Sequence, residues 1–273
     1  MTASILMPIE RFGASLRRTG GTVLDCVDFL GACCRSAIRY NGPAFRFSWR
    51  TVATQIRYTV TDAVPLIATI SFMAGLMIIA VSQGFAAKLG IAKTLGDILA
   101  TIIIRELGPL LAAITVIARS ATAMSTEMAS SRVLGEFDAL DAAGVDPLQV
   151  FVVPRVFSCA LGVTILTVLF DAIALLGGLA ATWWFARLRP AAYLASLRLA
   201  LGETSFDVVL LKAAVCGATI AFISCWAGVR TGGSAADLPR SVTRGTVLSL
   251  LGVFLLSSLF AIFSISRNAW LPR

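Results

Sequence analysis

Three charged residues interrupt an otherwise apolar stretch between residues 98 and 126, and they are the side chains best placed to carry chemistry. Arg105 and Glu106 are adjacent, and Arg119 follows them. In a bilayer-crossing helix over this stretch, each arginine would lie about 10 Å from the membrane centre. A central charge costs about 2.5–3.5 kcal/mol to insert, so such residues typically find partners or face a wet cavity. We therefore predict that Arg105, Glu106 and Arg119 line a substrate pathway.

Pro109 and Asp171 complete the predicted pathway. Pro109 lies one turn after Arg105, and because proline has no N–H it leaves a backbone carbonyl unpaired and can bend the helix. Asp171 is the single charge between residues 156 and 186. The sequence leaves open whether Asp171 makes a buried polar contact or faces the pathway.

Several kinds of chemistry are excluded by what the sequence lacks. It has no histidine, which removes HExxH zinc sites and histidine-based nucleophile pairs. It has no GxxxxGK[ST] motif, so we do not expect the chain to hold ATP in a P-loop. The six cysteines show no CxxC spacing and are expected to be buried free thiols. We expect no metal site, no cofactor in this chain and no enzymatic activity of its own.

The composition indicates a membrane protein. Hydrophobic residues make up 58% of the 273 residues and charged residues 14%, whereas soluble domains have about 25% charged residues. The net charge of +8 is not gathered into a basic block with interleaved aromatics, which argues against a nucleic-acid partner. Five stretches are long and apolar enough to cross a bilayer: residues 63–87, 97–126, 156–186, 213–229 and 245–266. We predict an all-α polytopic membrane protein with five transmembrane helices.

The chain divides into an N-terminal region, residues 1–61, and a five-span membrane domain, residues 62–267. The N-terminal region has no uncharged stretch that could span a bilayer and no pattern of a cleavable signal peptide. Apolar residues recur in it at helical spacing in two stripes, which predicts amphipathic helices in the membrane interface. The stripes are Val23, Val27, Leu30, Cys34 and Ala37, then Phe45, Trp49, Val52 and Ile56.

The distribution of basic residues predicts the orientation. With the N-terminus in the cytoplasm, 13 basic residues lie inside and 8 outside, which agrees with the positive-inside rule. An odd number of spans then places the C-terminus on the periplasmic side.

An acidic amphipathic segment joins the second and third spans. A helix at about residues 130–146 would combine the apolar Phe137 and Leu140 with acidic flanks, and Gly144 can end it. The segment is either a solvated connector or a docking element whose apolar knob enters a groove on a soluble partner. The residues predicted to couple the chain to such a partner are Glu136, Phe137, Asp138, Leu140 and Asp141.

The run RELGPLLAAITVIARSATAMSTEMASSRVLGEFDALDAAGVDPLQVFVVPR, residues 105–155, resembles the MlaE/YrbE family of permease subunits. Weaker similarity extends over about residues 50–260. This resemblance implies a multi-pass permease of the bacterial inner membrane, paired with a second copy as a homodimer. It also implies a cytoplasmic ABC ATPase dimer that binds ATP and docks at the helix between spans two and three, and a periplasmic hexamer of an MCE-domain protein. The implied substrate is phospholipid, and the implied role is maintenance of outer membrane lipid asymmetry.

Two other functions fit a chain of this composition. One is an ion-coupled secondary transporter of a hydrophobic substrate, in which Arg105, Glu106 and Asp171 form a relay; the absence of inverted repeats counts against it. The other is a membrane scaffold that holds an envelope complex together.

Overall fold

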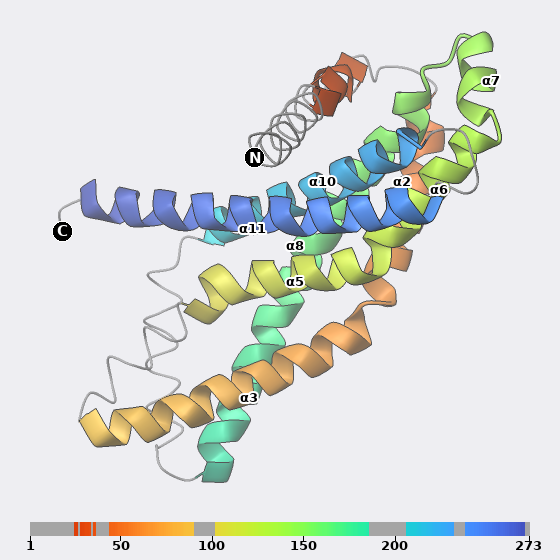
Figure 1. Cartoon of the computed structure of the whole chain (residues 1–273). Coiled ribbons are helices and arrows are strands. Elements are labelled where there is room, and N and C mark those ends of the chain that lie inside the picture. Colours follow the sequence, from red (N-terminus) through yellow and green to blue (C-terminus); the bar gives the residue numbers. More distant parts are fainter. Residues whose placement is uncertain are drawn as a thin grey trace, which may run out of the picture.

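The computed structural model describes residues 25–26, 28–33, 35–36, 44–89, 102–185, 206–231 and 238–270, and all regular structure within them is helical (Figure 1). The elements are α2 (Ala44–Thr61), α3 (Val64–Leu89), η1 (Ile103–Leu107), α5 (Gly108–Val116), η2 (Ile117–Ala121), α6 (Thr122–Val133), α7 (Glu136–Ala142), α8 (Pro147–Phe185), α10 (Phe206–Val229) and α11 (Leu238–Trp270).

Within the described residues, five helical segments are long and apolar enough to cross a membrane, which confirms the predicted fold class. They cover Val64–Val81, Ile103–Val133, Pro147–Trp184, Phe206–Val229 and Pro239–Ser264. The second segment runs without a break from η1 through α5 and η2 to α6. Helix α8 has 39 residues and is about 58 Å long, so it extends well beyond a hydrocarbon core of about 30 Å.

Helix α8 is the scaffold on which α2, α3 and α10 pack, and α10 also contacts α6 and α11. Close approach of α3 and α8 depends on two glycines. A Cβ at Gly75 would overlap the carbonyl group of Ala174, and one at Gly177 would overlap the carbonyl group of Phe72. Small residues at such contacts bring helix backbones together where lipid provides no hydrophobic driving force. The Gly177 region therefore serves packing within one continuous helix.

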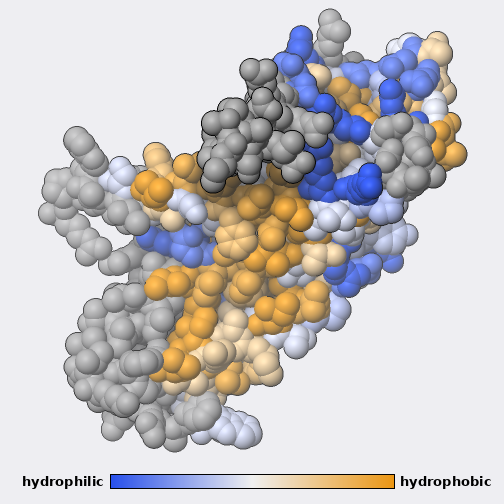
Figure 2. All heavy atoms as spheres, viewed as in Figure 1, coloured by the Kyte–Doolittle hydropathy of each residue, from blue (hydrophilic) through white to orange (hydrophobic). Residues whose placement is uncertain are grey.

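The helices differ in how much surface they bury. Helix α10 lies inside the bundle, whereas α3 and α11 keep most of their span exposed. On α11 the side chains of Leu255, Ile262 and Phe263 are among the exposed apolar groups. Figure 2 shows apolar residues forming a broad continuous area across the middle of one face, with hydrophilic residues gathered toward the end where α7 lies. Such an area suits contact with lipid tails or with another membrane chain.

Helix α2 lies against α8 and leads into α3 through a turn at residues 62–63. Val52 is buried, and its carbonyl accepts a hydrogen bond from Ser158 Oγ at 3.3 Å, whereas Arg57 and Tyr58 are exposed. One face of α2 is thus held by the bundle. The predicted stripe residues Val23, Val27, Cys34, Ala37, Phe45 and Trp49 lie outside the residues whose side chains the structure describes. Placement of this region in the membrane interface stays a prediction.

Two glycines shape the connection between α6 and α8. Gly135 has φ 75° and separates α6 from α7, so the predicted helix at about residues 130–146 is divided in two. Gly144 has φ 73° and lies two residues after the end of α7, where the sequence predicted the helix to end. Asp146 then caps α8, because its Oδ1 accepts a hydrogen bond of 2.9 Å from the N–H of Leu148. Asp146 Oδ2 accepts a further hydrogen bond from Ser36 Oγ in the N-terminal helical residues.

Candidate functional site

The second span is wound as a π-helix where its charged residues lie. In η1 the N–H of Gly108 donates to the carbonyl of Ile103, five residues back. Pro109 follows immediately and has no N–H for the carbonyl of Arg105, four residues before it. That carbonyl accepts a hydrogen bond of 3.3 Å from Lys212 Nζ on α10. The freed carbonyl expected from the sequence is therefore satisfied by a side chain from another helix.

Glu106 forms an ion pair with the same lysine. Lys212 Nζ lies 2.5 Å from Glu106 Oε2. The Lys212 side chain is only 3% exposed, whereas the Glu106 side chain is 39% exposed. An ammonium buried among apolar helices is stable only with partners of this kind. The pair thus places one enclosed cation and one accessible anion at the same point of the bundle.

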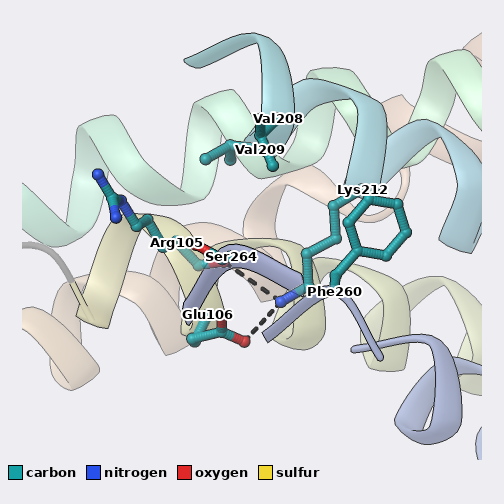
Figure 3. A pocket seen from close by; sticks show the side chains of 7 residues that line it. All are labelled: Arg105, Glu106, Val208, Val209, Lys212, Phe260 and Ser264. Atoms are coloured by element: carbon teal, nitrogen blue, oxygen red, sulfur yellow. Dashed lines mark hydrogen bonds and ion pairs between the residues drawn. The ribbon is translucent and has the colours of Figure 1, made fainter. Parts of the chain in front are cut away.

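A small pocket opens beside this pair (Figure 3). It is lined by Arg105, Glu106, Val208, Val209, Lys212, Phe260 and Ser264, which come from η1, α10 and α11. Its free space is about 20 Å³, which suffices for a water molecule and not for a lipid. In Figure 3 the Glu106 carboxylate points toward the lysine, and the Arg105 guanidinium points away from it. The two adjacent charged side chains therefore point in different directions, as their spacing on a helix predicts.

Lys212 is a site residue that the sequence pattern alone does not single out. The fourth span predicted from the sequence begins at residue 213, where the uncharged run starts, so Lys212 falls just outside it. In the structure α10 begins at Phe206, and Lys212 lies inside the helix. The signal that could have identified it is the apolar run 208–211 before the lysine, which makes it a charge with apolar sequence on both sides.

Asp171 lies next to the same turn of the second span. A Cβ on Gly108 would collide with the Asp171 carboxylate, so the carboxylate sits directly against the Gly108 backbone. Asp171 Oδ1 is buried and has no hydrogen-bond partner among the described residues. The structure thus brings Asp171 beside the segment that holds Glu106 and Pro109, although Asp171 does not line the pocket.

Arg119 lies away from this group. It falls in η2, and its Nη2 is 3.7 Å from Asp62 Oδ2 at the turn between α2 and α3. Both side chains are about half exposed. Along the helix, Arg119 is about 20 Å from Glu106. Of the predicted pathway residues, the structure therefore groups Arg105, Glu106, Pro109 and Asp171 and places Arg119 elsewhere.

Helix α7 is short and acidic, with Glu136 and Asp138 in its first turn. Arg132 at the end of α6 pairs with Asp138, at 3.1 Å from its Oδ1. Glu136 and Asp141 are exposed, and Leu140 is partly buried. These acidic side chains are free to meet a soluble partner, and the helix lies at an extreme end of the molecule (Figure 1).

The expectation that Phe137 forms an exposed knob is wrong. Its side chain is 5% exposed and stacks on Phe151 of α8, with ring centroids 5.3 Å apart. Burying a phenylalanine stabilises the fold, and a seven-residue helix needs such an anchor to be held in place. The apolar side chain that stands out here is Leu134, which is 73% exposed in the turn before α7.

Comparison with known proteins gives a family match over most of the chain. A family model described as Permease MlaE matches residues 52–263. This range contains α7, six of the seven pocket residues and all five apolar spans that the structure describes, apart from Ser264, which lines the pocket at the end of the fifth span.

Three relatives illustrate the similarity. A probable ABC transporter permease protein of Synechocystis is 34% identical over 61% of this chain and 63% of its own length. The protein trigalactosyldiacylglycerol 1, chloroplastic, of Arabidopsis thaliana is 29% identical over 79% of this chain and 63% of its own. A probable ABC transporter permease protein of Rickettsia conorii is 27% identical over 77% of this chain and 82% of its own. The chain thus spans less than two thirds of the first two relatives.

Proposed function

Since the chain belongs to the MlaE permease family and is a multi-pass permease of an ABC-type transporter, we propose that it moves phospholipid between the inner membrane and a periplasmic MCE-domain protein. Energy comes from a cytoplasmic ABC ATPase dimer that binds ATP. Two copies of this chain form the membrane part of the complex, and a hexamer of the MCE-domain protein receives or delivers the lipid. The N-terminus faces the cytoplasm.

The observation that carries the lipid assignment is the Glu106–Lys212 pair inside an apolar bundle. A phospholipid needs an apolar surface for its tails and a polar group for its head. The exposed faces of α3 and α11 offer the first, and the half-exposed Glu106 beside Lys212 offers the second. The pocket beside the pair is too small for a lipid, so in this proposal a second copy has to complete the pathway. The Arabidopsis relative is named after a glycolipid, trigalactosyldiacylglycerol, which also favours a lipid substrate.

Coupling to the ATPase is assigned to α7 and the turn before it. The exposed Glu136, Asp138 and Asp141 offer charge, and the exposed Leu134 offers an apolar contact. Phe137 fixes α7 to α8, so a force applied to α7 is passed to the longest helix of the bundle.

Purification of the tagged chain from its own membranes in mild detergent tests this proposal. We expect an ATPase subunit and an MCE-domain protein among the bound proteins, and phospholipid in the organic extract. The purified complex in vesicles should then transfer labelled phospholipid only with hydrolysable ATP. Transport driven by an ion gradient without nucleotide would establish the secondary transporter instead, and a complex without lipid or transport would favour the scaffold.

A further inference from the structure

Three arginines gather where α10 ends and α11 begins. Arg230 directly follows α10, and Arg240 and Arg244 lie in the first two turns of α11. The uncharged run 213–229 ends beside Arg230, and the uncharged run 245–266 starts beside Arg244. All three therefore stand at one boundary of the hydrocarbon region, at the depth of lipid headgroups.

The three arginines line a pocket together with the aromatic side chain of Trp226. The lining residues are Trp226, Ala227, Arg230, Thr231, Arg240, Ser241 and Arg244, and none of them is acidic. The pocket has about 200 Å³ of free space, against about 20 Å³ beside the Glu106–Lys212 pair. The Trp226 side chain is buried, and the guanidinium carbons of Arg230 and Arg244 lie 5.3 Å and 5.7 Å from its ring centroid. These cation–π contacts hold two guanidinium groups at the rim.

The charge of the pocket is only partly balanced. Arg230 Nη2 lies 2.5 Å from Asp25 Oδ2 in the N-terminal helical residues. Arg240 is exposed, and no carboxylate of the described residues lies within ion-pair distance of it. Among the described residues, the ion pairs around the pocket thus leave Arg240 as a positive charge without a carboxylate partner.

We propose that this pocket binds the phosphate group of an anionic phospholipid from the adjoining leaflet. Guanidinium groups bind phosphate oxygens through paired N–H donors, and Ser241 supplies a hydroxyl at the same rim. Basic pockets between transmembrane helices are known to bind anionic headgroups in this way. The site is distinct from the transport pathway, because Lys212 and Arg230 are about 27 Å apart along α10. It goes beyond the proposed function and does not depend on it.

The test is lipid binding to the purified complex in detergent, measured by native mass spectrometry. The complex is titrated with phosphatidylglycerol or with phosphatidylcholine, each with and without inorganic phosphate. The variants are Arg240→Gln, the double variant Arg240→Gln/Arg244→Gln, and Arg57→Gln as a control with an exposed arginine on α2 that lines neither pocket. Because Arg240 is exposed, its substitution leaves the fold intact, and size-exclusion profiles check this for every variant.

We expect the wild-type complex to bind phosphatidylglycerol in preference to phosphatidylcholine, with no displacement by inorganic phosphate. Each arginine near a membrane surface contributes about 1 kcal/mol, so binding should weaken about fivefold in the single variant and about 25-fold in the double variant. The Arg57 variant should bind like the wild type. Equal binding of both lipids, or unchanged binding in the double variant, would overturn the proposal. Displacement by inorganic phosphate would show a free-anion site, and loss of the ATPase subunit with lipid binding intact would show a protein-docking site; either result also overturns it.

Discussion

Lys212 Nζ lies 2.5 Å from Glu106 Oε2 and 3.3 Å from the carbonyl oxygen of Arg105, so one buried lysine ties α10 to the π-helical turn of the second span. The carbonyl is available because Pro109 cannot donate to it. A proline and a lysine that are far apart in the sequence therefore act on the same backbone group. A ligand that binds Glu106 would therefore act on a side chain that is linked to both helices.

The two partners of this pair should differ in how much their loss costs. Glu106→Leu leaves an ammonium that is 3% exposed without its carboxylate, whereas Lys212→Met leaves a carboxylate that is 39% exposed and can reach water in the pocket. Breaking a buried pair costs about 3–5 kcal/mol, and the cost falls with exposure. We therefore expect Glu106→Leu to lower the melting temperature of the purified protein more than Lys212→Met does.

The double variant Glu106→Leu/Lys212→Met separates stability from function. Removing both charges should restore the melting temperature to near that of the wild type, while ATP-driven lipid transfer stays lost. Asp207→Asn in the exposed first turn of α10 is the matched control and should change neither quantity. Normal transport by the double variant would mean that the pair only stabilises the fold.

A further prediction follows from the contact between Gly108 and Asp171. Gly108→Ala places a methyl group against the Asp171 carboxylate and should destabilise the protein by about 1–3 kcal/mol through overpacking. Asp171→Ala opens space for that methyl group, so the double variant should be more stable than Gly108→Ala alone. Thermal unfolding of the four proteins gives the coupling energy. Additive effects of the two substitutions would show that the side chains do not meet.

The sequence predicted the spans well because the energy of inserting apolar helices depends on local composition. The five runs and the helix end at Gly144 are local features, and the described residues contain them. Partners from distant helices were not predictable in this way. Local composition does not say that Lys212 meets Glu106, or that Asp171 meets Gly108, because each contact joins segments far apart in the sequence.

Phe137 illustrates the same limit on a smaller scale. The sequence predicts its position on an apolar helix face, but an apolar face can turn toward a partner protein or toward its own chain. Phe137 turns toward its own chain, because its ring stacks on Phe151 of α8.

Orientation in the membrane is open to direct measurement. Ala139 is exposed on α7, and Trp184 is 83% exposed near the other end of α8. In a variant without native cysteines, Ala139→Cys should react with a membrane-impermeant maleimide only after the cells are opened. Trp184→Cys should react in intact spheroplasts. Ala92, which lies outside the described residues, offers a second reporter for the outer side. Labelling of positions 139 and 184 from the same side would contradict the five-span topology.

The last prediction concerns the coupling of ATP hydrolysis to transport through α7. Phe137→Ala removes the ring that stacks on Phe151 and should cost about 3–5 kcal/mol of local stability, enough to release a seven-residue helix. Leu134→Ala removes an exposed side chain and should leave the melting temperature of the isolated chain unchanged. Both variants should retain less ATPase on affinity purification, but for different reasons. The first loses the shape of the docking element, and the second loses a contact.

Asp138→Ala and Asp141→Ala test the contribution of the acidic side chains to ATPase binding. Charges at the rim of an interface mainly change the association rate and its salt dependence. A buried apolar contact often contributes about 2 kcal/mol or more to the binding free energy. We expect these acidic substitutions to weaken ATPase retention less than Phe137→Ala does, and to matter less as the salt concentration rises. Because Asp138 is paired with Arg132, its loss should also be milder than that of the exposed Asp141. If Leu134→Ala, Phe137→Ala and Leu140→Ala together leave ATPase copurification and lipid-stimulated hydrolysis unchanged, the docking site is not on α7, and the segment from residue 230 to residue 244 becomes the place to test.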